Sequence, residues 1–144
     1  MRDRPMTETR PWAPPLFSAE PGERPSLLGR RCDDCGYVFF PPHDFGCEAC
    51  GALPARTEPT VLAGAGVLRS FATVHRHSGP GIAAPFVVGE IELDAGPMVR
   101  CVIEGETALR IGDRMRALAC SIPATADREA KVEVRFEKAQ EEGT

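Results

Sequence analysis

Four of the six cysteines lie in one stretch, "CDDCGYVFFPPHDFGCEAC", as two C-x2-C pairs with eleven residues between Cys35 and Cys47. A C-x2-C turn places two sulfurs on one side of a metal, and a second turn brought across by a hairpin completes a tetrahedron with bonds of about 2.3 Å. Glycine follows each pair (Gly36 and Gly51), which suits turns that need positive φ. The pattern predicts one zinc ion, with a rubredoxin-type iron as the alternative, bound by Cys32, Cys35, Cys47 and Cys50.

The predicted centre is structural rather than catalytic, because four thiolates saturate the metal and leave no position for water or substrate. A segment of under about thirty residues cannot bury enough apolar surface to fold alone, whereas structural zinc contributes on the order of 10 kcal/mol or more to folding. His43 is a conceivable substitute ligand that four cysteines make unnecessary. The charges between the ligands, Asp33, Asp34 and Glu48, are interpreted as solvated loop charges.

Outside this cluster the sequence offers no convincing catalytic centre. Cys101 and Cys120 are in phase with apolar neighbours on predicted strands and are interpreted as small core residues. In "HRH", His75 and His77 lie on the same side of an extended chain, which leaves a second metal site or an acid–base role open without a third ligand in view. The sequence lacks the motifs of serine hydrolases, P-loop proteins, zinc proteases and deaminases.

From residue 64 onward, short segments alternate apolar and polar side chains, as strands do. The predicted strands are 66–74, 85–93, 98–104, 113–122 and 131–138. Before the fourth, "ALRIG" predicts about one helical turn ended by Gly112. This order predicts a mainly β fold with a five-stranded Greek-key barrel of the OB type, although an open antiparallel sheet or a sandwich fits the spacing nearly as well.

Four regions are predicted along the chain. They are a proline-rich N-terminal arm (1–26), a zinc ribbon (27–60), an OB-fold barrel (61–138) and a flexible tail (139–144). Six prolines in the arm remove backbone donors, so at most a short helix fits there, around "LFSAE", and the arm is predicted to be extended.

Charge and hydropathy limit the possible classes of function further. Seventeen basic and 21 acidic residues give a net charge of −4, which disfavours nucleic acid because binding to its phosphates needs a basic surface. No run of about 18 apolar residues predicts a membrane span, and no apolar signal-peptide core is found. We therefore predict a cytoplasmic protein, in which closely paired cysteines bind metal rather than form disulfides.

From about residue 27 to 137 the chain resembles the rubredoxin-like zinc ribbon plus OB-fold proteins, long catalogued as a domain of unknown function and associated with acyl-CoA metabolism. The matching pieces, in order, are "LLGRRCDDCG", "FFPP", "CEACG", "GAGVLRSFATV", "PFVVGEIELDAG" and "LRIGDRMRA". Two features depart from the family's pattern: the N-terminal segment is proline-rich where many relatives have a longer docking helix, and "PPHDFGCEAC" lacks the arginine often found after the prolines.

The resemblance implies a noncatalytic accessory subunit that docks a thiolase-fold catalytic subunit, such as a thiolase, a lipid-transfer-type aldolase or an acyltransferase. It also implies a role in holding the partner's acyl-CoA thioester. Candidate contacts for the CoA phosphates are Arg69, Arg76 and Arg100, with the 76–85 loop as an apolar trough. The alternative is a stand-alone nucleic-acid or regulatory binding module, and a third hypothesis is a free-standing enzyme that uses "HRH".

Overall fold

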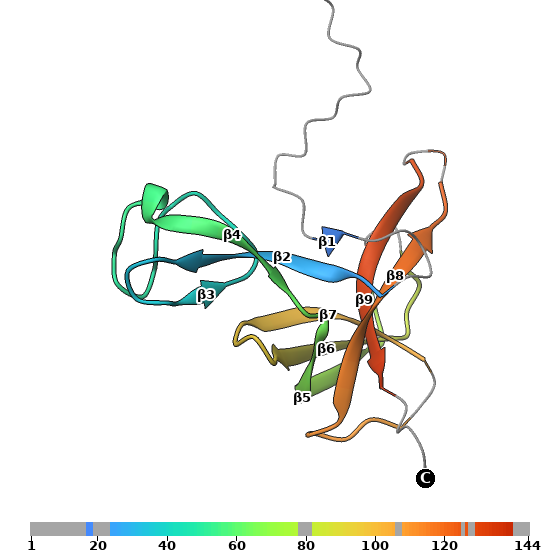
Figure 1. The fold of residues 1–144 in the computed structure, drawn as a ribbon. Helices are drawn as coiled ribbons and strands as arrows, with labels where there is room; N and C mark the ends of the chain where they lie inside the picture. Colours follow the sequence, from blue (N-terminus) through green and yellow to red (C-terminus); the bar gives the residue numbers. More distant parts are fainter. Residues whose placement is uncertain are drawn as a thin grey trace, which may run out of the picture.

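The computed structural model describes the backbone of residues 17–18 and, in full, residues 24–77, 82–105, 108–124, 126 and 129–139. Most of the predicted arm and tail therefore lies outside the described residues. The described chain forms two β units, a cysteine-bearing sheet and a closed barrel (Figure 1). None of its described helices has the length and apolar character needed to cross a membrane.

The first unit, which we call the ribbon (residues 26–62), is built around β2 (Ser26–Cys32). Strand β4 (Thr57–Leu62) pairs antiparallel with β2 along its length. The short strands β1 (Phe17–Ser18) and β3 (Val38–Phe39) also pair antiparallel with β2. A 3-10 turn, η1 (Pro54–Arg56), leads into β4. The described residues of "LFSAE", Phe17 and Ser18, are thus extended rather than helical.

The second unit is a five-stranded closed barrel in the order β5-β6-β7-β9-β8. Its strands are β5 (Ala65–Val74), β6 (Phe86–Leu93), β7 (Met98–Glu104), β8 (Arg114–Ile122) and β9 (Lys131–Lys138). All neighbours are antiparallel except β7 and β9, which run parallel and pair at only two positions. The predicted mainly β fold with a five-stranded barrel is confirmed, and closure excludes the open sheet.

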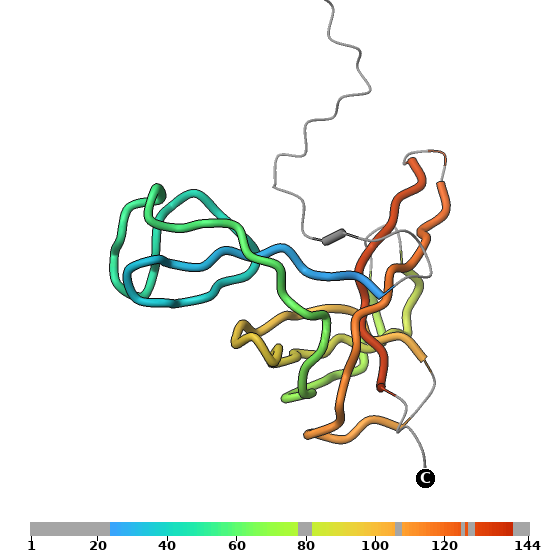
Figure 2. The backbone as a smooth tube through the Cα atoms, in the orientation of Figure 1, coloured from blue at the N-terminus to red at the C-terminus, as the bar shows by residue number. Residues whose placement is uncertain are grey.

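One hydrophobic core joins the two units. Leu27 and Leu62, which face each other across β2 and β4 of the ribbon, are 1% and 3% exposed because they pack into the core of the barrel. The remaining buried members come from the barrel strands: Leu68, Ile91, Leu93, Val99, Ile103, Met115, Ala117 and Phe136. In Figure 2 the ribbon projects from the barrel, and the loops that carry the cysteines lie at its far end.

Two local expectations are wrong. On β8 the buried side chains are Met115, Ala117, Ala119 and Ile122, whereas Leu118 and Cys120 are only half-buried, so Cys120 is not the core residue expected there. Both faces of this strand carry apolar residues, and the register with β9 decides which one turns inward.

The predicted helical turn before β8 is a hydrogen-bonded turn without a helix in residues 108–113. The backbone N–H of Gly112 donates to the carbonyl of Leu68 on β5 (2.8 Å), and the N–H of Arg110 donates to the Asp113 carboxylate (2.8 Å). These bonds fix the segment against the barrel and take donors away from a helix. Gly112 does adopt a positive φ, of 98°.

Candidate metal centre

The two C-x2-C segments fold into matching turns. In the first, the N–H of Gly36 donates to the carbonyl of Cys32 (2.9 Å), and the N–H of Cys32 donates to the carbonyl five residues later (2.8 Å). In the second, Gly51 and Cys47 repeat both bonds with the same offsets, at 2.9 Å each. The two glycines have φ of 79° and 78°, which non-glycine residues rarely adopt. Glycine at these positions therefore shapes both turns.

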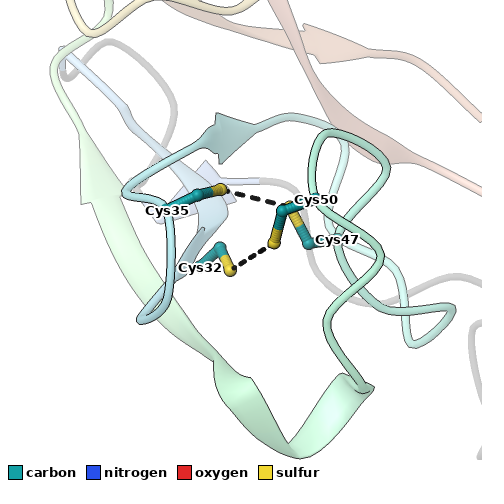
Figure 3. Close-up of side chains that lie close together, drawn as sticks. All are labelled: Cys32, Cys35, Cys47 and Cys50. Carbon is teal, nitrogen blue, oxygen red and sulfur yellow. Dashed lines mark hydrogen bonds between the residues drawn. The ribbon is translucent and has the colours of Figure 1, made fainter.

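These turns bring the four sulfurs together (Figure 3). The sulfurs of Cys32 and Cys50 are 3.7 Å apart, those of Cys35 and Cys47 are 3.6 Å apart, and all four lie within 4.8 Å of one another. A tetrahedron with zinc–sulfur bonds of about 2.3 Å has edges of about 3.8 Å, so the spacing fits a tetrahedral zinc. It is too long for disulfides, whose sulfurs are about 2.05 Å apart. The cluster thus supports a structural zinc.

The turns also shift the pKa values of the thiols. Burial raises the pKa of Cys47, but the backbone N–H groups of Cys50 and Ala49 outweigh it and bring the pKa down to about 7. The N–H of Ala52 lowers the pKa of Cys50, whereas the neighbouring Cys35 thiol and burial raise it, to about 12 overall. Thiolates at these separations repel one another, and a bound divalent cation removes that repulsion.

Two side-chain contacts tie the turns to their surroundings. The Tyr37 hydroxyl donates to the Glu48 carboxylate (2.9 Å), which links the first turn to the second. Arg56 pairs with Asp34 (2.5 Å) and holds the pKa of that carboxyl below its usual value. Asp34 and Glu48 are exposed, as the interpretation of them as solvated loop charges expects, and each also makes a side-chain contact. The Asp34 pair joins residues 22 positions apart, so no local sequence pattern signals it.

His43 takes no part in the cluster. Its ring lies between those of Phe39 and Phe45, with centroids 4.5 and 5.3 Å away. Its Nδ1 accepts the backbone N–H of Phe45 at 3.3 Å. This agrees with four cysteines as the ligand set.

The other candidates form no second metal centre among the described residues, although His75 and His77 border one open hollow. Cys101 packs against the core, and burial raises its pKa to about 12. Burial also raises the pKa of Cys120. His75 is exposed, and the His77 ring packs edge-on against Phe86 at 5.4 Å. In the part of the chain that the structure describes, the cysteine cluster is the only group of three or more metal-binding side chains close enough to share an ion.

Two of the three arginines predicted to contact CoA are engaged in ion pairs. Arg69 and Arg100 each pair with a glutamate of β6, Glu92 (2.7 Å) and Glu90 (2.9 Å) respectively. All four side chains are more than one third exposed. Arg76 lies beyond the end of β5, beside an open hollow of about 520 Å³.

The apolar trough expected in the 76–85 loop cannot be followed, because residues 78–81 lie outside the described residues. A cavity of about 440 Å³ instead lies where the ribbon meets β7 and β9. Leu27, Val99 and Val132 contribute to its apolar lining, and Arg100 also borders it. Sequence spacing does not signal this cavity, because it depends on β7 and β9 pairing at only two positions.

Two family models match the chain. The ChsH2 rubredoxin-like zinc ribbon domain matches residues 19–54, and the ChsH2 C-terminal OB-fold domain matches residues 60–119. A DUF35 domain-containing scaffold protein of Methanocaldococcus jannaschii is 33% identical over 78 residues, which are 54% of this chain and 54% of that protein. The chain thus aligns with about half the length of this relative.

Among solved structures, one named Ltp2-ChsH2(DUF35) aldolase is similar, with a TM-score of 0.60 and 23% identity. The match covers 78% of this chain and 84% of the other. At this identity the likeness concerns the fold, and it agrees with the ribbon and barrel described above.

Proposed function

We propose that this chain, which belongs to the ChsH2 (DUF35) family of zinc-ribbon and OB-fold proteins, is a noncatalytic accessory subunit of a thiolase-superfamily acyl-CoA enzyme. The archaeal relative is named a scaffold protein, and the similar solved structure is named an aldolase of Ltp2 and ChsH2. In this proposal the catalytic cysteine and histidines belong to the partner. The assembly is placed in the cytoplasm, where thiols stay reduced for metal binding.

The observation that carries the proposal is the way the two units are joined. Leu27 and Leu62 of the ribbon are buried in the core of the barrel, so the ribbon and barrel share one packed interior. The four thiols at the far end of the ribbon leave a bound metal no position for a substrate. Such a body suits holding a partner rather than performing chemistry.

Within this proposal, one structural zinc is held by Cys32, Cys35, Cys47 and Cys50. Metal analysis of the purified chain should give about one zinc per chain. A protein that is metal-free or iron-loaded and still folded would contradict this assignment.

The proposal extends to the CoA thioester of the partner's substrate. Its pantetheine arm needs an apolar trough and its phosphates need cations. The 440 Å³ cavity and Arg100 at its border support one such place, and Arg76 and Arg69 are the further candidate cations. Replacing Arg100 or Arg76 by alanine should weaken acyl-CoA binding to the complex, measured by calorimetry. Unchanged affinity in both variants would remove CoA contact from the proposal.

The experiment that tests the proposed function is a pull-down of the tagged chain from its native host at moderate salt. Mass spectrometry then identifies the co-eluting protein, and light scattering gives the mass of the complex. We expect a thiolase-fold enzyme in a fixed ratio to the chain. Recovery of the chain alone, or of the chain with nucleic acid, would contradict the proposal.

A further inference from the structure

The outer edge of β5 changes character halfway along the strand. Residues Ala65–Val67 pair with β8, and the outward N–H and carbonyl of Leu68 still bond to Asp113 and Gly112 (2.9 and 2.8 Å). A bulge follows between Leu68 and Ser70, and from there β5 pairs with β6 only. Within the described residues, no backbone hydrogen bond reaches the outer edge of residues 69–74. Five consecutive strand residues, 70–74, therefore present an open edge.

This edge is accessible. Ser70, Phe71, Ala72 and Thr73 are all exposed, although neighbouring strand residues point to opposite faces. Phe71, the largest of these residues, is 41% exposed. Neither face of this half of β5 is thus covered by the described chain.

Other open edges in the described chain carry residues that discourage pairing. Strand β4 has Glu58 and Pro59 within it, and proline lacks the N–H that a neighbouring strand needs. Where β7 and β9 diverge, the edge of β7 carries Arg100, and that of β9 carries Lys131 and Glu133. Residues 70–74 read "SFATV", with no charge and no proline.

Apart from the two-residue strands β1 and β3, one other open edge in the described chain is uncharged, the half of β8 beyond Ala117. There Ala119 and Ile122 are 4% and 8% exposed, so their side chains are already covered. The second half of β5 thus combines an open edge, uncharged side chains and exposure on both faces. Strands with this combination pair with an added strand.

Charge decides what the added strand is. If two copies paired antiparallel about Ala72, Arg69 of one would face His75 of the other, and Leu68 would face Arg76. Each end of the pairing would then bring Arg76 of one copy beside Arg69 of the other, where the carboxylate of Glu92 is already paired with Arg69, and this opposes self-association. A segment with an uncharged centre and a carboxylate at the end that meets Arg76 complements the edge instead, because Arg76 follows residues 70–74.

We propose that residues 70–74 of β5 take up an extended segment of the catalytic subunit as an added strand. The segment is uncharged and rich in β-forming residues at its centre, with a carboxylate side chain at the end that faces Arg76. This inference rests on the proposed function, since it names the surface by which the accessory subunit holds its partner. Main-chain hydrogen bonds supply the binding, and Arg76 orients the segment.

Hydrogen–deuterium exchange tests the inference on the complex with the co-purified catalytic subunit. The N–H groups of alternate strand residues point outward, so roughly two or three amides of residues 70–74 should become protected in the complex. If the catalytic subunit binds and this segment still exchanges as in the free chain, the inference fails and the proposed function stands. If no catalytic subunit binds, the proposed function itself fails.

Two proline variants add a binding readout. Of Ala72→Pro and Thr73→Pro, one removes a bond to β6 and lowers the melting temperature, while the other removes a donor at the open edge. The variant that keeps its melting temperature should bind the catalytic subunit about tenfold more weakly or worse. Leu53→Pro, at an exposed ribbon position whose φ of −65° already suits proline, is the matched control and should bind normally.

Two outcomes would overturn the choice of partner segment. One is native affinity in the proline variant that keeps its melting temperature. The other is protection of residues 70–74 in the chain alone, rising with its concentration, because that would make a second copy the occupant. Both variants keep Arg69, Arg76 and Arg100, so their acyl-CoA contacts are not altered directly.

Discussion

The ribbon and the barrel are both built from antiparallel pairs, but different interactions hold them. Eight buried apolar side chains of the barrel, among them Leu68, Ile91 and Phe136, pack together with two from the ribbon. Apart from those two leucines, the ribbon's buried side chains are few: Cys32, Phe39, Cys47 and Thr57. The Thr57 hydroxyl accepts from Arg30 (3.0 Å) and donates to the carbonyl of Pro54 (2.8 Å), so this buried polar group is satisfied.

The two units are therefore stabilised by different interactions. The barrel derives its stability from apolar burial, at about 25 cal/mol per Å². The far end of the ribbon buries too little apolar surface for that, and a structural metal contributes on the order of 10 kcal/mol in its place. The folded structure of the far end of the ribbon should therefore depend on bound metal, whereas the folded structure of the barrel should not.

The largest expected effect comes from losing the metal. Chelation, or Cys47→Ser, should unfold the far end of the ribbon and leave the barrel folded, because the barrel core has eight buried side chains of its own and the ribbon adds only Leu27 and Leu62 to them, with Val38 and Phe40 packed against it. Amide NMR should show residues 32–57 losing their dispersed signals while those of β5 to β9 persist. Cys120→Ser, outside the cluster, should keep both the metal and the spectrum. A ribbon that keeps its signals without metal would remove the contrast between the units.

The second effect tests the barrel side of the comparison. Phe136 is fully buried at the centre of the core, so Phe136→Ala should lower the free energy of unfolding by about 3–5 kcal/mol. The same substitution at Phe45, which is 90% exposed on the ribbon, should change it by less than about 0.5 kcal/mol. Urea unfolding of the zinc-loaded variants measures both values. Equal losses at the two positions would contradict the assigned roles.

The third effect lies where the two units meet. Leu27→Ala should cost about 2–5 kcal/mol and also separate the unfolding of ribbon and barrel, because Leu27 lies on a ribbon strand but packs in the barrel core. Leu53→Ala, on a side chain that is 73% exposed, is the control. Amide signals from each unit, followed through a urea titration, should coincide in the native chain and in the control. Coincident transitions in Leu27→Ala would mean that other contacts join the units.

The strands of the barrel could be predicted because each has a clear boundary in the sequence. The predicted 131–138 is the observed β9, and the predicted 98–104 is the observed β7. The inward face of β8 was not predictable in the same way. Ala117, Leu118, Ala119 and Cys120 are all apolar, so alternation does not choose a face there, and long-range pairing of Ala117 with Phe136 does.

The metal site was predictable for a different reason. Its ligands are close in sequence, and their spacing is itself a geometric statement about two turns. The contacts around the site were not predictable, since Arg56 and Asp34 meet only after β4 pairs with β2. The open edge of β5 likewise depends on where its pairing with β8 stops. Spacing in the sequence predicts the ligands and the strands, whereas which strands pair with one another is known only from the folded structure.

The smallest expected effect concerns surface ion pairs, which can add to the stability that the barrel gains from apolar burial. Arg114 binds both carboxylate oxygens of Asp94 (2.8 and 2.7 Å), and this hydrogen bonding lowers the pKa of Asp94 below its usual 3.8. A lowered folded-state pKa stabilises the fold above the unfolded-state pKa, and the contribution disappears as pH falls through the folded-state value. Both side chains are about half exposed, so solvent screening limits the contribution to about 0.5 kcal/mol.

Arg114→Met should therefore lower the free energy of unfolding slightly at pH 7, and the difference from the native chain should vanish in a series taken down through pH 4 to pH 2. Salt at about 1 M should shrink the difference at pH 7, because it screens exposed pairs. Arg110→Met is the control, since Arg110 has no ion pair among the described residues. A loss of several kcal/mol in Arg114→Met would mean that surface charge, and not apolar burial alone, separates the barrel from the ribbon.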